Sequence, residues 1–252
     1  MGRKSTQCSF GVTVLGGMPR LLADLPRRLF LVVMLVGAAL IATASREYFD
    51  FSRLPGFAVE KLPVRFESLW LASLRVHVAS ALVSFPLCLS LITRWLQRRP
   101  VWHRWIGRTA GIVVLLALVP TGSVLAFDAK GGWIVSAGFL LSGAIVAGAM
   151  VSGVAAARRR DFASHRHAMR HVIAQMSVAV SSRALIIAFD SLGMDPGLSY
   201  VVALWVPVLL SAGVVEWMSS RSSIIERITR ELSALAPVPV RRVVRSSHRR
   251  GR

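Results

Sequence analysis

Three of the six histidines of this chain lie in one arginine-rich stretch, residues 158–171, which also contains five arginines. Imidazole is the side chain best suited to carry protons or to bind a metal ion near neutral pH. The stretch lies between two long apolar segments, a position in which basic residues mark the cytoplasmic surface of a membrane. We therefore expect the histidine chemistry of this protein at one face of a membrane.

A fourth histidine, His103, lies in a second basic segment beside another apolar run, and we expect it at the same depth as His171. Histidines that project inward from facing helices of a bundle are typical axial ligands of b-type haem. Our leading specific hypothesis is one haem b between His103 and His171, with His167 as a substitute ligand. Arg104 and Arg170 would contact its propionates, and the haem would exchange electrons with a quinone or a redox partner.

The same pattern has two other interpretations. Histidines and arginines at the ends of membrane spans commonly make ordinary contacts with lipid headgroups. Two histidines four residues apart, such as His167 and His171, also suit a transition metal ion. These alternatives stay open, and the sequence assigns no particular metal.

A separate polar site is expected inside the membrane. His77 begins a polar stripe at helical spacing within the second apolar run, Arg75 precedes it by two residues, and Arg183 lies near the end of the fifth run. At ~1.5 Å of rise per residue, His77 and Arg183 would both lie roughly 10–12 Å below the outer surface. Ionisable residues at such a depth usually face the bundle interior. This supports an alternative function, a non-enzymatic membrane module or small-solute permease.

The composition is both apolar and strongly basic, with 54% hydrophobic residues and a formal net charge of +19. These two properties are compatible only when the charges are segregated between the apolar runs, and here nearly all of them are. A soluble nucleic-acid-binding unit needs a folded basic face with aromatic or motif support, which the sequence lacks. We expect the lipid bilayer and its anionic lipids as partners, and no nucleic acid.

Apolar runs of this number and length predict an all-α, polytopic transmembrane helix bundle. The six predicted spans are residues 29–44, 69–93, 106–127, 132–156, 169–190 and 199–218. The segments that would face one side contain 24 lysines and arginines, and the segments that would face the other contain 5. The positive-inside rule therefore predicts that both termini are cytoplasmic, in the cytoplasmic (inner) membrane of a bacterium.

We expect three parts in the chain. They are an irregular cytoplasmic segment at residues 1–28, the six-helix transmembrane domain at 29–218, and an amphipathic helix with a basic cytoplasmic tail at 219–252. Ser223 and Glu226 match a capping box that would start the amphipathic helix. The first run also fits a cleaved signal peptide, because basic residues precede it and small residues follow it at 42–44.

Enzyme signatures are lacking in the sequence. It contains no glycine-rich phosphate loop, no H-E-x-x-H, no nucleophile elbow and no paired intramembrane carboxylates. We therefore assign no catalytic residue, leave the biochemical activity unassigned, and expect at most a redox carrier.

Two motifs resemble a known family. They are His-Arg-Trp-Ile-Gly-Arg at residues 103–108 and Asp-Phe-Ala-Ser-His-Arg with Met-Arg at residues 161–170, preceded by His77 and followed by Arg183. Over about residues 70–190 the chain resembles domain of unknown function 2306, which implies a multi-pass membrane protein without an established activity. It is more loosely similar to cytochrome b561-type carriers, which hold two haems with four histidines; here the resemblance supports one inner haem at most.

Overall fold

The computed structural model describes residues 18–235, and the side chains of residues 25–221 within them. Every regular element in this part of the chain is a helix. The elements are α1 (Met18–Ala44), η1 (Ser45–Phe49), α2 (Gly56–Lys61), α3 (Glu67–Leu91), α4 (Arg94–Gln97), α5 (Pro100–Val113), η2 (Val114–Leu118), α6 (Val119–Phe127), α7 (Gly132–Arg158), α8 (Phe162–Ser191) and α9 (Pro196–Leu235).

Within the described residues, six helical segments of 25 to 30 residues are long and apolar enough to cross a membrane. They are Leu25–Phe49, Glu67–Leu91, Pro100–Phe127, Gly132–Arg158, Phe162–Ser191 and Pro196–Arg221. At ~1.5 Å per residue, each exceeds the roughly 30 Å of a hydrocarbon core. The predicted all-α bundle of six spans is therefore confirmed.

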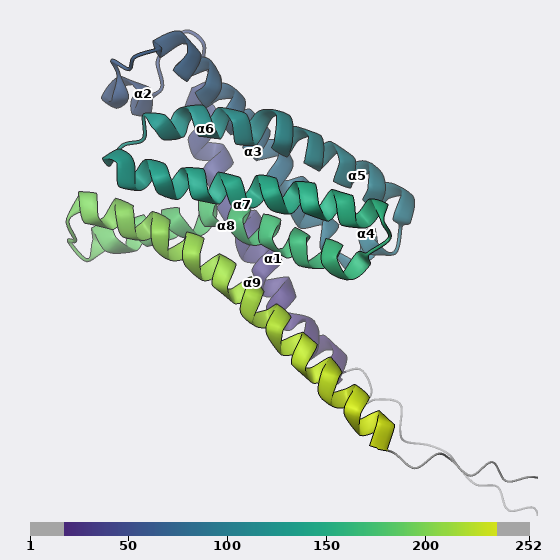
Figure 1. Cartoon of the computed structure of the whole chain (residues 1–252). Helices are drawn as coiled ribbons and strands as arrows, with labels where there is room; N and C mark the ends of the chain where they lie inside the picture. The colour runs from purple at the N-terminus through teal and green to yellow at the C-terminus, as the bar shows by residue number, and fades with distance from the viewer. Residues whose placement is uncertain (1–17, 236–252) are drawn as a thin grey trace, which may run out of the picture.

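The spans run back and forth across the bundle (Figure 1). Helix α8 packs extensively against both α7 and α9, and α3 packs against the third span, which is formed by α5, η2 and α6. Helix α1 crosses the bundle obliquely and touches α3 and α8 (Figure 1). We call the end with α4 and the α7–α8 connection the arginine-rich end, and the end with η1 and α2 the opposite end.

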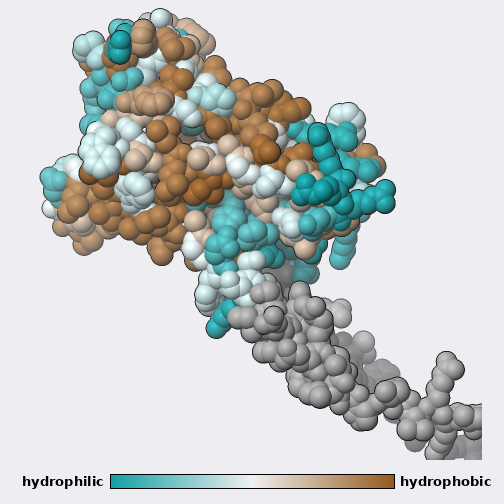
Figure 2. Space-filling view, viewed as in Figure 1, coloured by the Kyte–Doolittle hydropathy of each residue, from teal (hydrophilic) through white to brown (hydrophobic). Residues whose placement is uncertain are grey.

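The outside of the bundle is apolar between its two ends. Figure 2 shows hydrophobic residues over the middle of the bundle and hydrophilic residues gathered at the ends. Large side chains such as Leu40, Leu116 and Ile187 expose 65–76% of their surface. Exposed apolar surface on this scale suits lipid and not water, so the bundle is a multi-pass membrane protein in contact with a bilayer.

The first helix begins earlier than the sequence indicated. We expected residues 1–28 to be irregular, but α1 begins at Met18 and continues unbroken to Ala44. Pro19 is compatible with the early start, because it lies in the first turn, where no intrahelical N–H bond is lost. Pro26 lies inside the helix, so the bond from its nitrogen is missing there, but the helix continues past it. Residues 1–17 of the expected segment lie outside the described residues.

The arginine-rich stretch is mostly helix rather than loop. Helix α7 ends in a Schellman motif, with Arg160 in the left-handed region at φ 62° and the Asp161 N–H donating to the Ala156 carbonyl at 2.9 Å. Asp161 then caps α8 by accepting from the Ser164 N–H at 3.1 Å. The three histidines of the stretch therefore lie on the first turns of α8, in fixed positions.

The last span does not end where a new amphipathic helix was expected. Helix α9 continues from Pro196 to Leu235 without a break, so the Ser223 and Glu226 capping box does not begin a helix. Nothing in the sequence stops the helix there, because the first proline after Pro207 is Pro237. The proposed apolar face and the basic tail at 236–252 lie outside the residues whose side chains are described.

Candidate functional site

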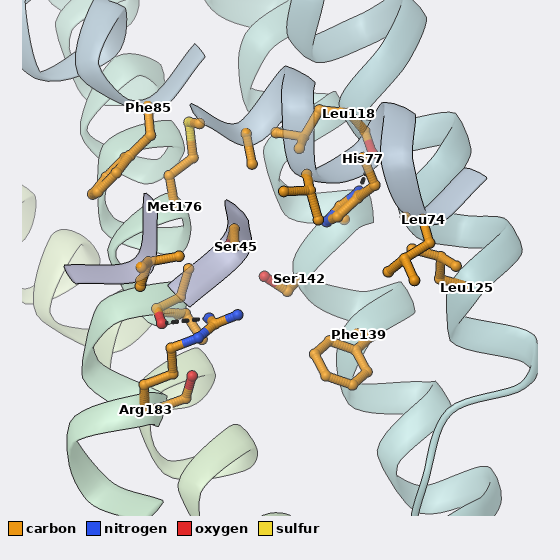
Figure 3. Close-up of a pocket in the computed structure, with 18 of the residues that line it drawn as sticks. Ser45, Leu74, His77, Phe85, Leu118, Leu125, Phe139, Ser142, Met176 and Arg183 are labelled. Atoms are coloured by element: carbon orange, nitrogen blue, oxygen red, sulfur yellow. Dashed lines mark hydrogen bonds between the residues drawn. The ribbon is translucent and has the colours of Figure 1, made fainter. Parts of the chain in front are cut away.

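A cavity of about 750 Å³ lies among α1, α3, α6, α7 and α8, toward the opposite end of the bundle (Figure 3). Its size is within the range of roughly 300–1,000 Å³ that is typical of small-molecule sites. Most of its lining is apolar, including Leu74, Phe85, Phe139 and Met176. The polar and charged residues of the lining are Ser45, Tyr48, His77, Ser123, Asp128, Lys130, Ser142, Gln175, Ser182, Arg183 and Tyr200.

His77 projects into this cavity from α3. Its Nδ1 lies 3.0 Å from the main-chain oxygen of Leu118, on the third span. Because a carbonyl oxygen can only accept, Nδ1 must carry the proton, and in the neutral ring Nε2 is then an acceptor. The cavity is therefore lined by an imidazole of defined tautomer.

The partner of His77 depends on an irregularity in the third span. Residues Val114–Leu118 form a π-helical turn, directly before Pro120. A proline inside a helix removes one hydrogen bond and crowds the preceding turn, and a π-turn relieves this crowding. Thr121 lies beside the site, with its hydroxyl 3.3 Å from the Leu118 oxygen and 3.5 Å from His77 Nδ1.

Gly122 makes room for the imidazole. A Cβ atom at this position would lie only 2.9 Å from Cε1 of His77 and 3.2 Å from its Nδ1. Contacts this short do not persist in folded proteins, so a side chain at residue 122 would displace the ring. The glycine and the π-turn together determine where His77 lies.

Arg183 points into the same cavity from α8 (Figure 3). Its Nη1 donates to the Ala179 oxygen at 2.9 Å. In the part of the chain whose side chains are described, it has no carboxylate within ion-pair distance. Asp128 also lines the cavity, but no ion pair joins it to Arg183 among the described residues. The guanidinium of Arg183 therefore has no direct counter-charge, which is costly within a membrane span.

Gln175 connects three helices at the inner edge of the cavity. Its Oε1 accepts from Ser142 of α7 at 2.9 Å, and its Nε2 donates to the Val208 oxygen and the Ser211 hydroxyl of α9, both at 3.0 Å. The residue is only 3% exposed. A buried amide with its oxygen and nitrogen both paired is a structural link, so we do not count Gln175 as a reactive group.

The predicted intramembrane site is assembled in part. His77 and Arg183 line one cavity, as residues of the second and fifth spans. Arg75 instead stacks its guanidinium over the ring of Phe51 at 4.4 Å, and it is not part of the cavity lining. The two residues of separation between Arg75 and His77 turn their side chains to different faces of α3.

A second group of ionisable residues lies at the arginine-rich end. His167 and His171 of α8 lie 3.4 and 2.8 Å from Oε1 of Glu216 on α9, measured from Nε2 of each ring. Glu216 was not singled out from the sequence, so this pairing was not predicted. The position of Glu216 within the last apolar run could have indicated it, because an acid inside a membrane span usually has a partner.

The two histidines proposed as axial haem ligands, His103 and His171, make no direct contact with each other among the described residues. Nε2 of His171 is directed to Glu216 on α9, whereas His103 lies on α5 within electrostatic range of His165. His103 and His171 share no hydrogen bond or ring contact in the described part of the chain. Arg104 and Arg170, proposed as propionate contacts, are both exposed.

Other cavity residues gave no signal in the sequence. Tyr48, Ser142 and Tyr200 belong to helices whose rotation is not apparent from hydropathy, and each is an ordinary residue at the end or along the side of a span. Their common location follows only from helix packing.

Comparison with known proteins supports the family resemblance. The model of a family described as "Predicted membrane protein (DUF2306)" matches residues 74–218. This range includes most of α3, the whole of α5 to α8, and both His77 and Glu216. No curated protein matches the chain, and no solved structure does. Because the match covers more than half of the 252 residues, the chain belongs to the DUF2306 family of predicted membrane proteins.

Proposed function

We propose that this membrane protein binds a small amphipathic organic acid in the cavity that His77 and Arg183 line. The observation that carries the proposal is the guanidinium of Arg183, which faces a largely apolar cavity without a carboxylate partner among the described residues. A ligand carboxylate or phosphate would neutralise this charge through charge-assisted hydrogen bonds.

The rest of the cavity suits the other parts of such a ligand. The unprotonated Nε2 of His77 would accept a hydrogen bond from a hydroxyl or a protonated acid group. Apolar side chains of α1 and α3, such as Leu35, Ile41 and Leu74, would contact a hydrocarbon body. This division between a few polar groups and an apolar wall is typical of sites that orient a ligand by its head group.

Helix α1 supports access from the bilayer. It lines the cavity but is the most loosely packed span. Of its apolar 18-residue stretch, 11% is buried, against 22–33% for the corresponding stretches of the other spans. A ligand with a hydrocarbon tail partitions into lipid, so a wall of this kind is a suitable entrance. On this basis we infer a binding module or a permease.

Binding of ¹³C-carboxyl-labelled octanoate to the protein in lipid nanodiscs tests the proposal. We expect saturable binding that octanol, which has the same tail but no charge, does not reproduce. Arg183→Gln should weaken the affinity at least about 10-fold, which is about 1.4 kcal/mol. The matched control is Arg75→Gln, an arginine of α3 outside the cavity, and it should change the affinity less than about twofold. Equal affinities of the two variants would refute the proposal.

Electron transfer through one haem b is the other functional hypothesis, and the described contacts support it less well. A bis-histidine haem requires Nε2 of His171 to face His103, but that atom lies 2.8 Å from Glu216. Expression with ample haem, followed by visible spectra before and after dithionite, tests it directly. A Soret band that His103→Ala and His171→Ala both remove would restore this hypothesis.

We also infer that the arginine-rich end faces the cytoplasm of a bacterium and contacts anionic lipids. The inference rests on the asymmetry of 24 against 5 lysines and arginines between the two sets of alternating segments outside the spans, the two terminal segments included. Reporter fusions at residues 159–161 should report a cytoplasmic location, and an external location would reverse this orientation.

A further inference from the structure

We propose that His167, His171 and Glu216 form a binding site for a divalent transition metal ion of the zinc class, between α8 and α9. The site is separate from the cavity, because none of the three residues belongs to the cavity lining. It is therefore independent of the proposed organic-acid site and of its test.

The three ligand atoms are already close together. One ring nitrogen of each histidine and one carboxylate oxygen of Glu216 all lie within 4.8 Å of one another. In a tetrahedral zinc site with bonds of about 2.0–2.1 Å, neighbouring ligand atoms are about 3.3 Å apart. The distances from Glu216 Oε1 to the two rings, 3.4 and 2.8 Å, are close to this value. Small side-chain rotations would complete the geometry.

The helix spacing explains why both imidazoles face the same point. Residues four apart on an α-helix lie on one side of it, one turn above the other. The rings of His167 and His171 meet edge to face with their centroids 5.0 Å apart. Glu216 approaches from the adjacent helix α9, which packs along most of α8. The ion would therefore link two spans.

The donor set determines the class of ion. Two imidazole nitrogens with one carboxylate oxygen suit zinc and other first-row transition metals, whereas magnesium and calcium prefer oxygen ligands. Two neutral histidines and one carboxylate carry a single negative charge, which partly offsets a divalent cation.

Access to the site is possible from the arginine-rich end. The side chain of His171 is 13% exposed, that of His167 35% and that of Glu216 62%. The inner ligand is thus protected, and the outer one is open to the surroundings. One coordination position would remain for water, as in zinc sites with three protein ligands.

Zinc retention by the full-length protein tests the proposal. The protein would carry no polyhistidine tag, and His248→Gln would be included in every variant to remove the histidine of the tail. After treatment with a chelator, it would be incubated with Zn²⁺ or Mg²⁺ and passed through gel filtration for elemental analysis. We expect about one zinc ion per chain and no retained magnesium.

The matched variants are Glu216→Gln and His103→Gln. Glutamine at 216 can still accept the hydrogen bond of His171 but is a poor zinc ligand. Loss of a residue that only supports a ligand lowers metal affinity by up to about 100-fold, so loss of a direct ligand should lower zinc affinity by at least that factor. His103→Gln removes a histidine of the same end outside the cluster and should leave the affinity unchanged. Failure of the parent protein to retain zinc, or equal retention by Glu216→Gln, would overturn the proposal.

X-ray absorption of the zinc-loaded parent protein gives a result that does not depend on how a variant folds. It should show two imidazole ligands and oxygen at about 2.0–2.1 Å from the ion. A spectrum without imidazole scattering would equally reject the site.

Discussion

The imidazole Nδ1 of His77 and the main-chain oxygen of Leu118 lie 3.0 Å apart and join α3 to the π-helical turn of the third span. This contact links the irregular backbone before Pro120 to the tautomer of the one histidine that lines the cavity. π-helical turns occur frequently at functional sites. The contact therefore provides both a stability test and a test of the proposed ligand site.

Replacing His77 by phenylalanine should have a small effect on stability. Phenylalanine keeps an aromatic ring at this position, and the Leu118 oxygen retains the Thr121 hydroxyl as a neighbour at 3.3 Å. We expect a loss of about 0.5–1 kcal/mol in the free energy of unfolding, the usual value of one interhelical hydrogen bond in a membrane. SDS titration in mixed micelles measures it. A loss well above this range would mean that His77 has a structural role that its described contacts do not explain.

Gly122→Ala should displace His77 without removing any functional group. Its Cβ would lie 2.9 Å from Cε1 of the imidazole, so we expect a loss of about 1–3 kcal/mol in stability. The ¹⁵N spectrum of His77 should also lose the signature of a proton held on Nδ1. Gly148→Ala is the matched control, because its Cβ would meet nothing within 4 Å, and it should be neutral or stabilising by up to about 1 kcal/mol.

Gln175→Leu should weaken the packing of α7, α8 and α9 together. The substitution breaks three hydrogen bonds and leaves the Val208 oxygen and two hydroxyls without this partner. We expect a loss of about 1.5–3 kcal/mol in the free energy of unfolding. Ser142→Ala breaks only one of these bonds and should cost about 0.6–1 kcal/mol. If the two variants were equally stable, the two hydrogen bonds from Gln175 to α9 would contribute nothing to the free energy of unfolding.

Gly37→Ala should push α1 away from α8. The added Cβ would overlap Cγ1 of Val180, and a β-branched side chain on a helix has little freedom to move aside. We expect Gly37→Ala to lower the free energy of unfolding, and Val180→Ala in the same protein to relieve this loss. The coupling energy between the two substitutions should be about 1–3 kcal/mol. Unfolding measurements on the four proteins of this cycle test it. Additive effects would show that α1 does not pack closely on α8 at this point.

The start of α8 should become less stable in acid. Hydrogen bonds from the Ser164 side chain and its main-chain N–H hold the pKa of Asp161 below its usual value. The stabilisation is therefore present above the unfolded pKa of about 3.9 and is lost as the pH falls through the lower folded pKa.

Asp161→Asn is the variant that tests this dependence. Asparagine keeps an acceptor for the cap but does not titrate, so the variant should not show the part of the acid destabilisation that Asp161 causes. Thermal unfolding between pH 3 and 6 compares the two proteins. Identical dependence of the unfolding temperature on pH would show that the charge of Asp161 makes no contribution to stability.

Much of the architecture was predictable because it depends on local properties of the chain. Apolar runs of about 20 residues must form helices in a bilayer, since their backbone groups have no other partners there. Segregation of arginine to alternate connections was equally apparent. The boundaries were less accurate: α1 begins at Met18 and α9 continues to Leu235, because a helix ends only where something stops it.

The sequence was sufficient to select residues of the candidate sites, but it did not show which of these residues contact one another. The cost of an ionisable group within a span was sufficient to select His77 and Arg183. It did not reveal that Arg75, two residues earlier, stacks on Phe51 instead of lining the cavity. It also did not reveal that His171 meets Glu216 rather than His103.

By itself, the sequence determined that this is a helical membrane protein of six spans, and its motifs identified the family. Only the tertiary structure decided which side chains meet: His77 with the Leu118 carbonyl, and His167 and His171 with Glu216. The physical reason is that hydropathy and charge act along one chain segment at a time. Partners across helices depend on the rotation and register of each helix, which close packing of whole surfaces sets.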